Sequence, residues 1–205
     1  MKKLNLALLS SSLYVAFQLF ANILSTKICL LPLLNLAVDG GTIIYPFTFT
    51  LRDFVHKTWG KHSARQVVII AGLLNIVMAV LFWLIGIMPA DPTWLNQDAY
   101  NVILAPVWRI TVASVIAQII SELVDTEIFS IAYKKFGDML GVLFSNSISL
   151  LIDSVLFSII AFAGMMPFNI VLQIILTNIL IKLVISIISV PTIKLLPQHV
   201  STSEI

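Results

Sequence analysis

Charged residues are scarce in this sequence, since Asp, Glu, Lys and Arg together make up only 11% of its 205 residues. Soluble domains carry roughly 25%. Hydrophobic residues make up 59%, and the mean hydropathy is +1.03. A water-soluble fold of this length cannot bury so much apolar surface, because surface area does not shrink fast enough with size. The composition therefore predicts an integral membrane protein.

Residues and motifs that carry chemistry in enzymes are also scarce. The single cysteine, Cys29, excludes a disulfide within the chain. The three histidines do not form an H-x-x-x-H or H-E-x-x-H pattern, and neither a Walker A sequence nor G-x-S-x-G occurs. The net charge of +2 is too small and too scattered for a nucleic-acid surface. We therefore expect no enzyme activity, no metal, no cofactor and no nucleic-acid partner.

Long apolar runs dominate what remains. A hydrocarbon core about 30 Å thick requires roughly 20 apolar residues per helix. We predict an all-α integral membrane protein, a six-helix bundle forming one domain over residues 1–205, with helices at 4–26, 42–58, 64–88, 106–135, 140–163 and 168–196. The run after Met1-Lys2-Lys3 has no small-residue cleavage site, so we expect a retained helix rather than a signal peptide.

The distribution of basic residues predicts the orientation of these helices. Cytoplasmic loops are enriched in Lys and Arg. With six crossings and a cytoplasmic N-terminus, most of the basic residues fall on the cytoplasmic side: Lys2, Lys3, Arg52, Lys57, Lys61, Arg65, Lys134, Lys135 and Lys194. The outer loops then carry Asp39, Asp91 and Asp98. The bias predicts that both termini are cytoplasmic, and it supports the two least apolar helices, 42–58 and 106–135.

Several predicted helices carry polar side chains that should face the bundle interior. A charge at the bilayer centre costs about 2.5–3.5 kcal/mol on insertion scales, so such residues usually face inward and serve function. At 100° per residue, Gln118, Glu122 and Asp125 share one face of the 106–135 helix. Asn146, Asp153 and Phe157 share a face of the next helix, and Asn178 and Lys182 a face of the last.

Two of these charges are expected to meet. Asp153 and Lys182 lie at similar depth, so we expect an ion pair, which can serve either function or helix packing alone. Asn22 lies on a polar stripe of the first helix, where amide side chains either bind a ligand or hold helices together. Asn75 stands alone in its helix, and we expect it to serve packing.

Two segments carry a resemblance to a known family. Tyr45-Pro46-Phe47-Thr48-Phe49, with Arg52-Asp53 and Trp59-Gly60-Lys61 behind it, is similar to the first signature of the queuosine precursor transporters, also called vitamin uptake transporters. Ser145-Asn146-Ser147, Asp153-Ser154 and 161–164 resemble the second signature of that family. Asn22, Lys27, Lys182 and Pro191 resemble positions in its first and last helices.

The resemblance implies import of 7-cyano- or 7-aminomethyl-7-deazaguanine across the bacterial inner membrane, for salvage into tRNA queuosine. A carboxylate suits the donor edge of such a base, an amide or ammonium suits its carbonyl, and an aromatic ring suits its flat face. The candidate substrate-binding residues are Asn22, Gln118, Glu122, Asp125, Asn146, Asp153, Phe157, Asn178 and Lys182. The expected partners are a deazapurine base and the lipid bilayer, and a homo-oligomer stays open. The alternative is a substrate-capture subunit of an energy-coupling-factor vitamin transporter.

Overall fold

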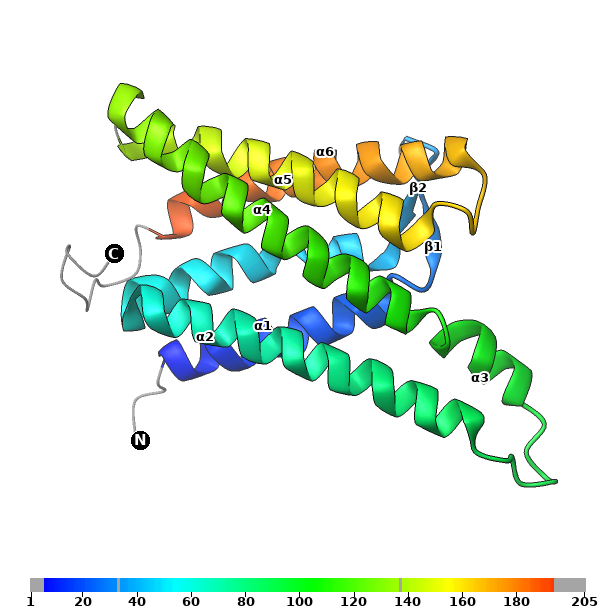
Figure 1. The fold of residues 1–205 in the computed structure, drawn as a ribbon. Coiled ribbons are helices and arrows are strands. Elements are labelled where there is room, and N and C mark those ends of the chain that lie inside the picture. Colours follow the sequence, from blue (N-terminus) through cyan, green and yellow to red (C-terminus); the bar gives the residue numbers. More distant parts are fainter. Residues whose placement is uncertain (1–5, 33, 137, 194–205) are drawn as a thin grey trace.

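The chain folds into a bundle of long helices with a small β-hairpin at one end (Figure 1). The computed structural model describes residues 6–32, 34–136 and 138–193. Within these ranges, side chains are left out at 53, 56, 57, 61, 122, 125–127, 129–136, 138–146, 186 and 189–193. The elements are α1 (Leu6–Leu24), β1 (Ile28–Leu31), β2 (Leu36–Asp39), the 3-10 helix η1 (Gly40–Ile43), α2 (Pro46–Ile87), α3 (Gln97–Leu104), α4 (Val107–Phe136), α5 (Asp138–Phe162) and α6 (Phe168–Ile193).

Helix α2 consists of two arms that meet at Gly60. This glycine has φ 84° and ψ 169°, a backbone conformation that residues with a Cβ rarely adopt. The chain reverses direction there, so residues 46–59 and 62–87 run in opposite directions (Figure 1). Pro46 begins the first arm, where its missing N–H is not needed. The two arms correspond to the predicted helices 42–58 and 64–88.

The other predicted helices match the observed helices to within a few residues. Not every helix is equally suited to cross a membrane. Four stretches of the described helices are long and apolar enough to cross a membrane: Leu6–Leu24, His62–Ile87, Gln97–Ser121 and Phe168–Ile185. Ser147–Phe162 forms a shorter apolar helix. The chain is therefore an all-α membrane protein apart from the hairpin. The first arm of α2 is shorter and carries Arg52 and Asp53.

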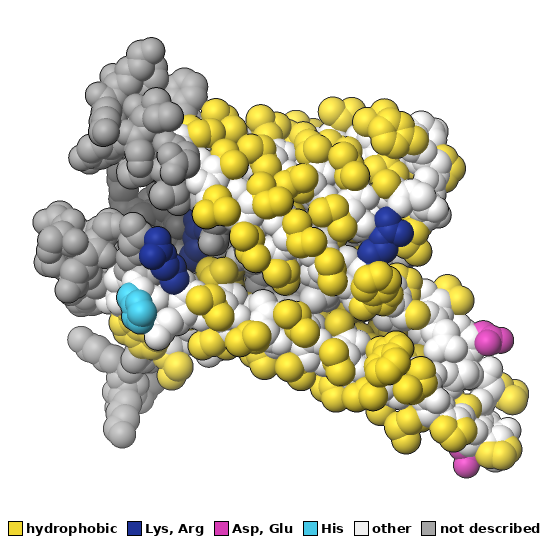
Figure 2. All heavy atoms as spheres, viewed as in Figure 1, with side chains coloured by type: hydrophobic (Ala, Val, Ile, Leu, Met, Phe, Trp, Pro, Cys, Tyr) yellow, Lys and Arg dark blue, Asp and Glu magenta, His cyan; other side chains and the backbone are white. Residues whose placement is uncertain are grey.

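The outer surface of the bundle is apolar, and polar side chains are buried inside it beside hydrophobic ones. Large hydrophobic side chains are exposed along α2, such as Ile69, Leu73 and Trp83, and Figure 2 shows hydrophobic side chains spread over the described part of the face. Buried positions include Ser158, Thr177 and other hydroxyl and amide residues. This arrangement suits a chain solvated by lipid, where polar groups must be satisfied internally.

Two segments that we expected to be loops are structured. The outer connection after the first helix forms the β1–β2 hairpin, in which Ile28 pairs with Asp39. Side chains of α6 hold β2, because Ala37 N donates to Gln173 Oε1 (3.0 Å) and Thr177 Oγ1 donates to Ala37 O (2.8 Å). The outer connection at 89–105 contains α3. In Figure 1 the hairpin lies at the opposite end of the bundle from the start of α1 and the end of α6.

Candidate functional site

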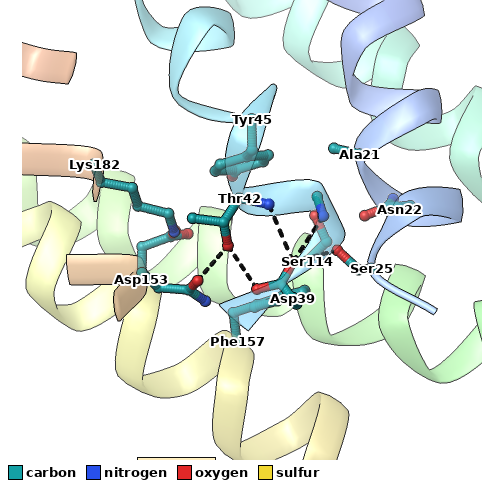
Figure 3. Close-up of a pocket in the computed structure, with 12 residues that line it drawn as sticks. Ala21, Asn22, Ser25, Asp39, Thr42, Tyr45, Ser114, Asp153, Phe157 and Lys182 are labelled. Carbon is teal, nitrogen blue, oxygen red and sulfur yellow. Dashed lines mark hydrogen bonds and ion pairs between the residues drawn. The ribbon is translucent and has the colours of Figure 1, made fainter. Parts of the chain in front are cut away.

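A cavity lies inside the bundle, beside the inner face of the hairpin and η1 (Figure 3). Six elements surround it, and its lining residues are Ala21, Asn22, Ser25, Asp39, Gly41, Thr42, Tyr45, Ser114, Asp153, Phe157, Asn178 and Lys182. The space between atoms, counted with its opening, is about 310 Å³. Only about 20 Å³ is open to the centre of a water molecule, which is room for roughly one water.

An ion pair joins α5 and α6 at one side of the cavity. Lys182 Nζ lies 2.6 Å from Asp153 Oδ2, and each residue is 3% exposed. The same ammonium lies 4.8 Å from the centre of the Tyr45 ring, within the range of a cation–π interaction. The predicted pairing is therefore confirmed. Asp153 lines the cavity, and its Oδ1 receives no hydrogen bond from the described residues.

A second carboxylate, Asp39, lies buried at the opposite side of the cavity. Its Oδ1 accepts hydrogen bonds from Ser25 Oγ (2.7 Å), Gly41 N (3.1 Å) and Thr42 N (3.2 Å). Its Oδ2 accepts from Thr42 Oγ1 at 2.7 Å. Asp39 therefore caps η1, since it satisfies the free N–H groups at the start of that helix. We expected Asp39 in an outer loop; in the structure this residue ends β2, and the hairpin folds its side chain inward, leaving 1% exposed.

Thr42 links the two sides of the cavity through a shared proton. Its hydroxyl reaches both Asp39 Oδ2 and Asn178 Oδ1, as the dashed lines in Figure 3 show. A hydroxyl has one proton and can donate to one acceptor at a time. The hydroxyl therefore donates to only one of these two oxygens at a time. The Asn178 amide nitrogen donates to Ser158 Oγ at 3.3 Å, and this hydrogen bond connects α6 to α5.

Five of the nine predicted site residues line this one cavity: Asn22, Asp153, Phe157, Asn178 and Lys182. Gln118 does not line it. Instead, Gln118 Nε2 donates to Tyr14 Oη (3.1 Å), which also accepts from Gln18 Nε2 (3.2 Å). This cluster links α4 to α1. The side chains of Glu122, Asp125 and Asn146 lie outside the described part of the chain.

Sequence reasoning missed several polar lining residues. Asp39 was read as part of an outer loop. Ser25 and Thr42 fell at the ends of the predicted helices 4–26 and 42–58 and were not chosen as site residues, and Tyr45 contributed only to the family resemblance. The available signal was Asp39-Gly40-Gly41-Thr42, because an aspartate followed by small residues is typical of a capped turn. Ser114 lies on the predicted polar face of the 106–135 helix but was not singled out as a ligand.

Among the described residues, no group of three or more His, Cys, Asp or Glu side chains is arranged to hold a metal ion. The cavity instead presents acceptor oxygens, one ammonium and the aromatic rings of Tyr45 and Phe157. Such a mostly apolar wall with a few placed polar groups is typical of a small-molecule site.

Comparison with known proteins points the same way. A sequence family described as "Putative vitamin uptake transporter" matches residues 39–196. The chain belongs to this family. The matched range begins at Asp39, the cap of η1, and includes Tyr45, Asp153 and Lys182. The predicted family resemblance is thereby confirmed.

A curated relative is similar to this chain over most of its length. It is the "Probable queuosine precursor transporter" of Bacillus subtilis (strain 168), which is 27% identical over 165 residues. The alignment covers 78% of this chain and 71% of the relative. No solved structure was found to match the chain. The protein is thus a transporter of this family, and its internal cavity is the candidate site for the transported molecule.

Proposed function

We propose that this protein imports a guanine-like 7-deazapurine, 7-cyano- or 7-aminomethyl-7-deazaguanine, through the cavity between α1, η1, α5 and α6. The observation that carries the proposal is the Asp153–Lys182 pair, buried beside Tyr45 within a bundle whose outer surface is hydrophobic. Ion pairs inside a membrane protein are costly, and they mark substrate paths more often than they stabilise the fold. The name of the Bacillus relative supports the same class of substrate.

The polar groups of the cavity suit the edges of such a base. A guanine-like edge carries a ring N–H and an exocyclic amino group, both donors, next to a carbonyl acceptor. Asp153 Oδ1 is an acceptor for the donor pair, and the Lys182 ammonium is a donor for the carbonyl. The rings of Tyr45 and Phe157 border the same space and suit the flat face of the base.

Entry of the base requires the bundle to open. The space available to water in the described structure is about 20 Å³, far below the 300 Å³ or more of typical ligand sites. Helices α1 and α2 pack mainly on each other, as do α4 and α5, and the Tyr14–Gln118 hydrogen bond joins α1 to α4. We propose that these two pairs of helices separate during transport and that the described state is occluded.

We also propose the complete topology: six crossings, with both termini in the cytoplasm of a bacterium and the hairpin at the outer face of the inner membrane. The reversal at Gly60 supports counting the arms 46–59 and 62–87 as separate crossings. The excess of Lys and Arg on one side of this arrangement supports its orientation. The imported base would enter queuosine synthesis for tRNA.

Expression in a bacterium that lacks both its own deazaguanine synthesis and its own transporter tests the proposal. Each base is supplied at low concentration, and queuosine in tRNA is measured. We expect queuosine to reappear with the wild type and to stay absent with Asp153→Asn/Lys182→Gln at equal membrane abundance. Asp98→Asn, an exposed acid on α3, is the matched control and should transport normally.

Failure of the inserted wild type with every deazaguanine would overturn the substrate proposal. Uptake that depends on co-expressed ATPase subunits would instead favour the energy-coupling-factor alternative.

A further inference from the structure

Asn75 connects the second arm of α2 to the wall of the cavity. Its Oδ1 accepts a hydrogen bond from Asn22 Nδ2 at 2.7 Å, and its Nδ2 donates to the backbone oxygen of Ala71 at 2.9 Å. Asn75 is 2% exposed and Asn22 is 3% exposed. Asn22 lines the cavity, whereas Asn75 is not among the lining residues. Asn75 thus joins two helices, as expected of a packing residue, and it also lies directly behind a residue that lines the cavity.

The chemistry of this chain fixes the orientation of both amides. A backbone carbonyl can only accept, so the Asn75 group facing Ala71 must be its NH₂. The Asn75 oxygen then faces Asn22, and the Asn22 group facing Asn75 must in turn be its NH₂. Asn22 is left with its oxygen on the cavity side, as Figure 3 shows, and no described residue donates to that oxygen. The backbone of α2 thus determines that Asn22 presents an acceptor.

We propose that Asn75 is a positioning residue that sets the donor-acceptor selectivity of the transporter by holding Asn22 Oδ1 toward the substrate. The inference rests on the proposed function and adds a named element of recognition to it. Asn22 thus gives the cavity a fixed acceptor on its α1 side, across from Asp153, so the part of the ligand that faces Asn22 must be a donor. A guanine-like base offers such a donor.

The fixed orientation matters because it rejects a close analogue. In a deazaxanthine, a carbonyl replaces the 2-amino group, so an acceptor faces an acceptor. A freely rotating amide would turn its NH₂ to that carbonyl and accept both bases. A buried site built for one hydrogen-bonding pattern discriminates strongly, because the wrong ligand leaves polar groups unpaired. Asn75 prevents the rotation, since turning Asn22 would place two oxygens against each other.

Competition for uptake tests the inference. Uptake of labelled 7-cyano-7-deazaguanine is measured with increasing unlabelled 7-cyano-7-deazaguanine or 7-cyano-7-deazaxanthine. The readout is the half-inhibitory concentration of the deazaxanthine divided by that of the deazaguanine. We expect Asn75→Leu to lower this ratio about tenfold, a change equivalent to about 1.4 kcal/mol. Asn75→Ala removes the same contact with less bulk and serves if the leucine variant does not accumulate.

Two controls separate positioning from folding. Asn75→Asp keeps an oxygen that accepts from Asn22 in either protonation state, and it should retain the wild-type ratio. Ile76→Ala alters a half-exposed neighbour on the outer face of α2 and should also retain it. If Asn75→Leu and Asn75→Ala change the half-inhibitory concentrations of both bases by the same factor, the ratio is unchanged. The inference is then overturned, while the proposed function stands. If the wild type takes up neither base, both fail.

Discussion

Lys182 Nζ lies 2.6 Å from Asp153 Oδ2, with both side chains almost wholly removed from the surface. Removing one partner of a buried pair leaves an uncompensated charge, at a cost of about 3–5 kcal/mol. We predict that Asp153→Asn and Lys182→Met each lower the free energy of unfolding by about that amount. The double variant should lie within roughly 1 kcal/mol of the wild type, because no charge is then left alone.

Thermal unfolding in detergent measures this cycle. Asp98→Asn supplies a carboxylate-to-amide control at an exposed position. If the two single losses add up in the double variant, the charges are not coupled and the pair does not have the role described.

Two glycines of η1 lie against α1 without room for a side chain. A Cβ on Gly41 would overlap Ser25 Oγ and the backbone oxygen of Ala21, whereas a Cβ on Gly72 in α2 would have nothing within 4 Å. We predict that Gly41→Ala lowers the free energy of unfolding by about 1–3 kcal/mol. Gly72→Ala should stabilise by up to about 1 kcal/mol through helix propensity. Unfolding midpoints in detergent check both, and equal midpoints would show that η1 can move away from α1.

Most of the helices could be predicted from the sequence because their apolar runs are long, and Pro167 marks the start of α6. The first arm of α2 is short and carries Arg52, so it was predicted from the distribution of basic residues, and its start at Pro46 was not predicted. The hairpin could not be predicted, because its two strands are only four residues each and are held by long-range contacts such as that from Gln173 to Ala37.

The candidate site was predictable only where it lies on helices. Helical periodicity placed Asp153, Phe157, Asn178 and Lys182 on facing surfaces, and they line one cavity. Periodicity says nothing about a residue in a connection, so the burial of Asp39 in the cavity wall was not predicted. It also cannot show which amide meets which, so the contact between Asn22 and Asn75, 53 residues apart, had no sequence signal.

Asp39 depends on being an acceptor at both oxygens. Four donors from Ser25, Gly41 and Thr42 converge on it. Asp39→Asn would turn an NH₂ toward at least one of these donors. We predict that the free energy of unfolding falls by about 1–2 kcal/mol, the range for a lost helix cap. Uptake should also fall, because η1 forms a wall of the cavity. Asp98→Asn, at an exposed position on α3, is the control. Unchanged unfolding and uptake in Asp39→Asn would contradict the capping role.

Arg109 of α4 holds the end of α5. Its Nε donates to the backbone oxygen of Ile160 at 2.7 Å, and its Nη2 donates to that of Ala163 at 2.5 Å. These carbonyls lie where α5 ends before Gly164, which has φ 81°, so they lack partners within the helix. A cation there also offsets the negative end of the helix dipole.

A lysine keeps the charge of Arg109 but cannot match two acceptors with a rigid fork. We therefore predict that Arg109→Lys lowers the free energy of unfolding by about 1.5–3 kcal/mol, the value of one hydrogen bond to a charged group. Backbone amides in the last turn of α5 should exchange with solvent faster than in the wild type. The matched control is Arg65→Lys, since Arg65 is exposed on α2. Equal stability and equal exchange in the two variants would mean that the guanidinium does not hold α5 in place.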